Sequence, residues 1–122
     1  MVEVTQEQFE ALFNVLVPFT LAKNKTYGDN WQKRGELLSV MGNILRKTDR
    51  FEKMAMDMAD GLEIDVDDKI DTVADLAVYC LLYLMWLRSK QSVGWNAFVD
   101  KVRNYVVTHS KDIFELFKDK LS

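Results

Sequence analysis

The fold of this chain is decided by residues 66–88, which read VDDKIDTVADLAVYCLLYLMWLR. From Val73 to Leu87 the run is apolar except for Asp75 and two tyrosines. A membrane-spanning helix needs about 20 apolar residues, so this shorter run predicts a buried helix and no membrane span. Because the helix is apolar nearly all round, no single neighbour can cover it. We therefore expect it to lie at the centre of a homo-oligomer.

Helical spacing also predicts the elements before this run. Residues 5–8 read TQEQ, which has the form of a capping box, and apolar residues then follow a 3.6-residue period into the low twenties. Pro18 should kink this helix or end its first half. Residues 24–35 show no periodicity and predict an ordered loop. A second helix should run from Leu37 to Asp60, where Gly61 suits a left-handed C-cap.

The third helix should begin near Asp65 or Asp67, either of which can cap it. After Arg88 the apolar spacing returns from Trp95 to about residue 106, and Ser110 can cap a last short helix. No alternation typical of strands occurs. The prediction is one all-α domain over residues 1–122, with a core at 5–90 and a helical extension at 91–122.

Composition narrows the class of protein. The chain has 122 residues, 48% of them apolar and 29% charged, which is typical of one soluble globular domain. A net charge of -3 argues against direct, nonspecific DNA binding. The single cysteine, Cys80, excludes a disulfide within the chain and fits a reducing cytosol. No secretory signal is apparent at the N-terminus, so we expect a cytoplasmic protein.

Two carboxylates and a phenol form one stripe on the third helix. Asp71, Asp75 and Tyr79 follow each other at four-residue spacing, so they share a helix face. A carboxylate in an apolar helix is costly to bury unpaired, so a cation must face Asp75. Mg²⁺ is one candidate, held by Asp71 and Asp75. The alternative is an ion pair with a cation of the preceding helix: Arg46, Lys47 or Arg50.

Basic residues lie in two places from which they can reach a phosphate. Lys47 and Arg50 share a helix face, where they either bind phosphate or remain solvated surface charge. Residues 23–31 read KNKTYGDNW. Their lysines, Lys23 and Lys25, suit phosphates, and two aromatic side chains suit stacking on a base. The alternative for this segment is an ordinary turn whose aromatic residues, Tyr27 and Trp31, cover the core.

Together these residues resemble a known family. The series Lys23-x-Lys25-x-Tyr27-Gly28-Asp29-x-Trp31, Lys47-x-x-Arg50 and Asp71-Thr72-x-x-Asp75-Leu76-x-x-Tyr79 resembles a largely phage-borne family, nucleotide modification associated domain type one. That family is similar to the all-α MazG-like nucleotide pyrophosphohydrolases. The resemblance covers roughly residues 5–88. It implies a helical bundle that forms dimers or tetramers, with nucleotide sites in the bundle. The nucleotide-binding residues it implies are Lys23, Lys25, Tyr27, Asp29, Trp31, Lys47, Arg50 and Tyr79.

The chain departs from the MazG-like pattern at the metal site. Those enzymes hold Mg²⁺ with Glu-Glu-x-x-Glu on one helix and Glu-x-x-Asp on a later one. Here the later motif corresponds to Asp68-x-x-Asp71, or is replaced by Asp71 with Asp75, while Arg46-Lys47-Thr48-Asp49-Arg50 stands where the first is expected. Cations have replaced carboxylates. A site with two cations can hold phosphates directly, without the full metal set.

Two functions follow from the resemblance. The first is a Mg²⁺-dependent nucleoside triphosphate pyrophosphohydrolase, in which Asp71 and Asp75 hold the metal and a metal-bound water attacks in line. The alternative is a non-catalytic oligomer that sequesters or senses a nucleotide, including a signalling nucleotide. A structural helical oligomer with no ligand is a third interpretation. If the chain is phage-encoded, the compartment is the host cytoplasm.

Overall fold

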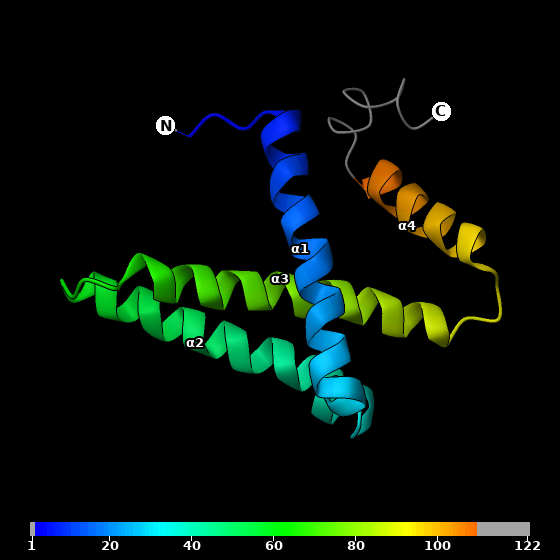
Figure 1. Ribbon diagram of the computed structural model, residues 1–122, viewed down its shortest axis with the longest axis horizontal. Coiled ribbons are helices and arrows are strands. Elements are labelled where there is room, and N and C mark those ends of the chain that lie inside the picture. Colours follow the sequence, from blue (N-terminus) through cyan, green and yellow to red (C-terminus); the bar gives the residue numbers. More distant parts are fainter. Residues whose placement is uncertain (1, 110–122) are drawn as a thin grey trace. The chain divides into compact units, whose positions relative to one another are not determined.

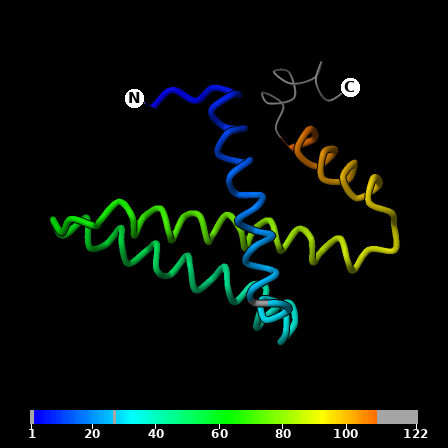
Figure 2. The backbone as a smooth tube through the Cα atoms, viewed as in Figure 1, coloured from blue at the N-terminus to red at the C-terminus, as the bar shows by residue number. Residues whose placement is uncertain are grey.

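A computed structural model describes residues 2–109, apart from the side chain of Tyr27 (Figures 1 and 2). These residues form α1 (Gln6–Tyr27), a short 3₁₀-helix η1 (Gly28–Trp31), a π-helix η2 (Glu36–Met41), α2 (Gly42–Ala59), α3 (Val66–Ser89) and α4 (Trp95–His109). No strand occurs within this described part. The all-α prediction is confirmed.

The start of α1 is the predicted capping box. The amide of Gln8 donates to Thr5 Oγ1 at 3.2 Å, and the Thr5 amide donates to Gln8 Oε1 at 3.3 Å. The prediction that the helix ends in the low twenties was wrong, because α1 continues through Pro18 to Tyr27. A proline removes one backbone donor, and the hydrogen bonds on either side can keep a long helix intact.

The loop predicted at residues 24–35 is partly helical. The last turn of α1 takes residues 24–27, and η1 follows directly. Asn24, Lys25 and Thr26 are exposed, so this turn carries no apolar periodicity that a sequence pattern could reveal. Gly28 and Gly35 have φ of 56° and 85°, a backbone region that favours glycine, and they bracket the segment in which the chain turns toward α2.

The second helix begins with a π-helical turn. The Arg34 amide donates to Ser39 Oγ at 2.8 Å, and both Ser39 and Val40 are buried in η2. The far end of α2 closes as predicted. Gly61 has φ of 86°, its amide donates to Met58 O at 3.0 Å, and the Leu62 amide donates to Asp57 O at 3.0 Å. This pair of hydrogen bonds is a Schellman motif.

Helix α3 starts and ends close to its predicted bounds. Its first turn is capped by Asp65, whose Oδ1 accepts from the Asp67 amide at 3.3 Å and whose carbonyl accepts from Lys69 at 3.2 Å. α2 and α3 are antiparallel neighbours joined by the short connector after Gly61 (Figure 1). Ion pairs between the two helices tie them together.

The chain divides into two compact units, Met1–Met85 and Trp86–Ser122. The division lies within α3, slightly before the boundary expected between the core at 5–90 and the extension at 91–122. In the second unit, α4 carries Phe98 as its buried residue and ends at His109. The helix predicted after Ser110 lies outside the described residues.

The first unit has a small apolar core for its length. Its buried apolar side chains are Val40, Val78 and Leu82, with Thr72 and Asp75 as buried polar neighbours. By length and composition alone α3 is apolar enough to cross a membrane. The ion pairs that reach Asp75 from Lys23 and Lys47 show that this part of α3 packs against α1 and α2.

Candidate anion-binding site

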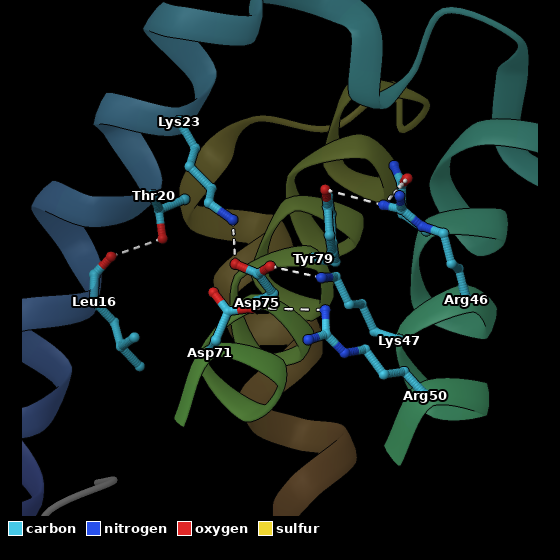
Figure 3. A network of polar contacts seen from close by, with 10 residues as sticks. Leu16, Thr20, Lys23, Arg46, Lys47, Arg50, Asp71, Asp75 and Tyr79 are labelled. Carbon is cyan, nitrogen blue, oxygen red and sulfur yellow. Dashed lines mark hydrogen bonds and ion pairs between the residues drawn. The ribbon is translucent and has the colours of Figure 1, made fainter. Parts of the chain in front are cut away.

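The centre of the site is the carboxylate of Asp75, which two lysines hold from two different helices. Lys47 of α2 places its Nζ 2.8 Å from Asp75 Oδ2, and Lys23 of α1 contacts Oδ1 (Figure 3). One buried side chain of α3 therefore joins three helices. The prediction that Asp75 faces a cation across the interface of the second and third helices is confirmed for Lys47.

The second lysine, Lys23, lies near the C-terminal end of α1. Lys23 precedes the extra turn that the sequence pattern did not predict, and its Nζ lies 4.9 Å from the Phe19 ring centroid and 5.8 Å from that of Tyr79. Both distances allow cation–π attraction. Two aromatic rings and one carboxylate thus fix the position of this ammonium group.

Asp75 is ionised at neutral pH. Burial raises the pKa of this carboxyl, but hydrogen bonds from Lys23 and then Lys47, together with their charges, outweigh burial and hold the pKa below its usual range. The lysines therefore face a permanent negative charge.

A cavity of about 360 Å³ opens beside this cluster, within residues 1–85. Its size is at the lower end of the range of about 300–1,000 Å³ for small-molecule sites. Its lining residues come from α1, η1, α2 and α3: Lys23, Asn24, Asn30, Trp31, Asn43, Arg46, Lys47, Asp75, Tyr79 and Leu82. Three cations, one carboxylate, two aromatic rings and three amides thus surround one space.

Hydrogen bonds hold the aromatic side of the cavity. Trp31 Nε1 donates to Asn24 Oδ1 at 2.9 Å, and Asn43 Nδ2 donates to the Trp31 carbonyl at 3.2 Å. Arg46 Nη2 donates to Asn43 Oδ1 at 3.2 Å and lies 3.5 Å from the Tyr79 hydroxyl (Figure 3). The indole, the phenol and the guanidinium group therefore have defined places in the wall.

The structure brings together about half of the residues that the sequence predicted for the site. Those that line the cavity are Lys23, Trp31, Lys47, Asp75 and Tyr79. Those that do not are Lys25, Asp29, Arg50 and Asp71. Tyr27 is the last residue of α1, and its side chain lies outside the described part of the structure.

The predicted residues outside the cavity have other surroundings. Asp29 Oδ1 accepts from Gln32 Nε2 at 3.3 Å, and Lys25 is an exposed residue in the last turn of α1. Arg50 lies 3.7 Å from Asp71 in an exposed pair. Arg46, which the sequence suggested only as an ion-pair partner of Asp75, takes the place in the wall that was expected for Arg50.

Sequence reasoning missed the amides and one apolar residue of the wall. Asn43, Arg46 and Lys47 lie at positions i, i+3 and i+4 of one helix, so their shared face was a usable signal. Asn24, Asn30 and Leu82 gave no comparable signal, because their contribution depends on how η1 folds against the helices.

The residues expected to hold Mg²⁺ do not fit a metal site as they are arranged. Both oxygens of Asp75 are bound to ammonium groups, and Asp71 faces Arg50. Among residues 2–109 there is no group of three or more His, Cys, Asp or Glu side chains that could hold a metal ion. Magnesium binding remains a prediction from the resemblance.

The chain is similar to a phage protein. It is 36% identical over 98 residues to "Gene 30 protein" of Bacillus phage SP01, a match that takes 65% of this chain and 44% of the relative. The chain thus spans less than half the length of that relative. No protein-family model matches the chain, and no solved structure matches it. The relative agrees with the phage origin that the resemblance implied.

Proposed function

We propose that this protein binds a phosphorylated small molecule of the nucleotide class in the cavity beside Asp75. The observation that carries the proposal is the convergence of Lys23, Arg46 and Lys47 on one space. Among the residues that the structure describes, Asp75 is the one carboxylate in the lining, so the described lining side chains carry a formal charge of +2. An excess of positive charge in a cavity attracts an anion, and guanidinium and ammonium groups are the usual phosphate ligands.

The rest of the wall supports a nucleotide over a simple phosphate ester. Trp31 and Tyr79 supply aromatic surface on which a base can stack. Asn24, Asn30 and Asn43 supply amides, which can both donate to and accept from the edge of a base. A cavity that combines cations, aromatic rings and amides has the groups needed for phosphate and base together.

Binding without turnover is the first candidate function. A pyrophosphohydrolase of the MazG-like type requires a metal-activated water, and the carboxylates proposed for that metal are engaged by Lys23, Lys47 and Arg50. Hydrolysis is therefore the second candidate, carried by the sequence resemblance.

Assembly is part of the proposal. Helix α3 leaves several large apolar side chains exposed within the first unit: Ile70, Val73, Leu84 and Met85. A soluble protein rarely leaves such residues in contact with water along a whole helix, so we expect a second copy of this chain to cover them. Light scattering at tens of micromolar should give a dimer or a larger species. A monomer of 14.2 kDa would contradict this expectation.

The test of the binding function compares two arginines on one helix. Arg46 lines the cavity and Arg50 does not, so Arg46→Met should weaken nucleotide binding by about tenfold, whereas Arg50→Met should stay within about twofold of wild type. Calorimetry with a nucleotide panel, with and without Mg²⁺, measures the affinities of the two variants and of the wild-type protein. Chromatography of the recovered nucleotide separates binding from hydrolysis. If no nucleotide binds to the wild-type protein, the proposal is wrong.

A further inference from the structure

We infer that the cavity is built for one phosphate, so that its ligand is a nucleoside monophosphate bound without a divalent metal. This inference rests on the proposed function and names the ligand class for the same site. Its basis is the charge, the donor count and the size of the space around Lys23, Lys47 and Asp75.

The charge of the wall matches a single phosphate. A phosphate monoester carries about -1.5 to -2 at pH 7. Three cations and one carboxylate line the cavity, which leaves a formal +2. Each additional phosphate adds negative charge that no further cation of the lining can balance. The nearest other cation of α2, Arg50, is already paired with Asp71 and does not line the space.

The carboxylate of Asp75 further disfavours a ligand with more than one phosphate, because it cannot move away from the ligand. It is buried, it is ionised, and both of its oxygens are held by lysines (Figure 3). A longer phosphate chain bound by the same two lysines would bring more negative charge close to this fixed carboxylate. Proteins that bind nucleoside triphosphates commonly offset such charge with Mg²⁺ and carboxylates free to hold it. Asp75 is not free for that role.

The lysines keep enough donors for one phosphate group. An ammonium group has three N–H donors and no acceptor. Lys23 and Lys47 each direct one donor to Asp75, so each retains two for a ligand. Asp75 thus positions both lysines at the edge of the cavity. The guanidinium of Arg46 also lines the cavity, and its N–H groups other than those of Nη2, which bonds to Asn43 and Tyr79, add further donors.

The experiment is a titration series at constant base and sugar. Calorimetry with AMP, CMP, GMP, UMP and dTMP identifies the preferred base, and the matching nucleoside, diphosphate and triphosphate are then compared, each in EDTA and in Mg²⁺. We expect the monophosphate to bind about tenfold tighter than either the nucleoside or the triphosphate in EDTA, and to bind equally well in Mg²⁺. A triphosphate that binds tighter, or binding that requires Mg²⁺, would overturn the inference. Absence of binding by every nucleotide would instead refute the proposed function.

A matched pair of variants tests the role of Asp75 in this selectivity. Asp75→Asn keeps the shape of the side chain and removes its charge, so the preference for monophosphate over triphosphate should fall by about threefold or more. Asp71→Asn removes a charge one turn earlier on α3 and outside the cavity, so the same ratio should stay unchanged within error. Equal ratios in both variants and wild type would contradict a role for Asp75. If Asp75→Asn does not fold, the wild-type series still decides the inference.

Discussion

Helices α2 and α3 make two ion pairs one turn apart, and the two differ in almost everything except the charges. Lys47 and Asp75 lie 2.8 Å apart with side chains 11% and 9% exposed. Arg50 and Asp71 lie 3.7 Å apart with side chains 47% and 59% exposed. The inner pair also receives Lys23 from α1, whereas no second cation is within ion-pair distance of Asp71 among the described residues.

The comparison shows that residue spacing on a helix predicts which residues form ion pairs, but not how much each ion pair contributes to stability. Both pairs follow from the same four-residue step on α3 and three-residue step on α2. Water screens the outer pair, so its contribution is about 0–1 kcal/mol. The inner pair is largely removed from water. Loss of one partner therefore leaves the other charge buried without a counter-charge, which is strongly destabilising. The inner cluster should therefore control both stability and binding.

The largest effect should come from the carboxylate that three helices share. Asp75→Ala leaves Lys23 and Lys47 close together with no counter-charge, and we expect the free energy of unfolding to fall by on the order of 3 kcal/mol. Urea denaturation followed by circular dichroism measures this loss.

The matched control is Asp71→Ala on the same helix. Its partner Arg50 is exposed, so the expected loss is below about 1 kcal/mol. If the two alanine variants lose the same stability, burial does not distinguish the two pairs and the comparison fails.

Acid should remove the contribution of the inner cluster. The pKa of Asp75 is lower in the folded protein than the ordinary value of 3.8, since Lys23 and Lys47 outweigh the effect of burial, which raises it. A lowered pKa means that the stabilisation is complete above the unfolded pKa and is lost as the pH falls through the folded pKa. The difference in unfolding free energy between wild type and Asp75→Asn should therefore shrink as the pH is taken below about 4. A difference that stays constant down to pH 2 would contradict this assignment.

Removing one lysine should cost less than removing the carboxylate. In Lys23→Met, Asp75 keeps Lys47, so we expect a loss of about 1–2 kcal/mol, close to the value of one hydrogen bond to a charged group. Lys47→Met should lose a similar amount, and the double variant should lose more than the sum, because Asp75 is then buried without a partner. Strict additivity of the two losses would show that the lysines do not share the carboxylate.

Much of the backbone followed from the sequence, because its signals are local. The capping box at Thr5, the C-cap at Gly61 and the bounds of α3 depend on residues within one or two turns of each other. The need of Asp75 for a cation was predictable for the same reason, since a carboxylate within an apolar helix requires a partner. Lys47 was a candidate partner because it lies on α2, the helix that directly precedes α3 in the sequence.

Lys23 was among the residues expected at the site, but its contact with Asp75 was not predictable in this way. Lys23 reaches Asp75 across 52 positions of sequence, and only tertiary packing brings them together. The helix turn that follows Lys23 is polar and exposed, so it contains no apolar periodicity from which a helix could be predicted. Asn24 and Asn30 entered the cavity wall for the same reason. The three-dimensional arrangement, and not the residue types alone, separates the cavity from the exposed pair.

The smallest expected change in stability concerns the hydroxyl of Thr72, which is buried without a hydrogen-bond partner among the described residues. Thr72 lies on α3 between Asp71 and Asp75 in the sequence. Thr72 is fully buried, and within the described residues its hydroxyl makes no hydrogen bond. An unpaired buried hydroxyl is destabilising, so Thr72→Val, which keeps the shape, should raise the unfolding free energy by up to about 1 kcal/mol.

Thr20 provides the matched control for this variant. Its hydroxyl donates to the Leu16 carbonyl at 2.7 Å, so Thr20→Val should lower stability by about 0.5–1 kcal/mol instead of raising it. Opposite signs for the two substitutions, measured by thermal denaturation under one set of conditions, would show that the hydrogen-bond partner decides whether a threonine hydroxyl removed from water stabilises the fold. A loss at Thr72 as large as the loss at Thr20 would contradict an unpaired hydroxyl at this position.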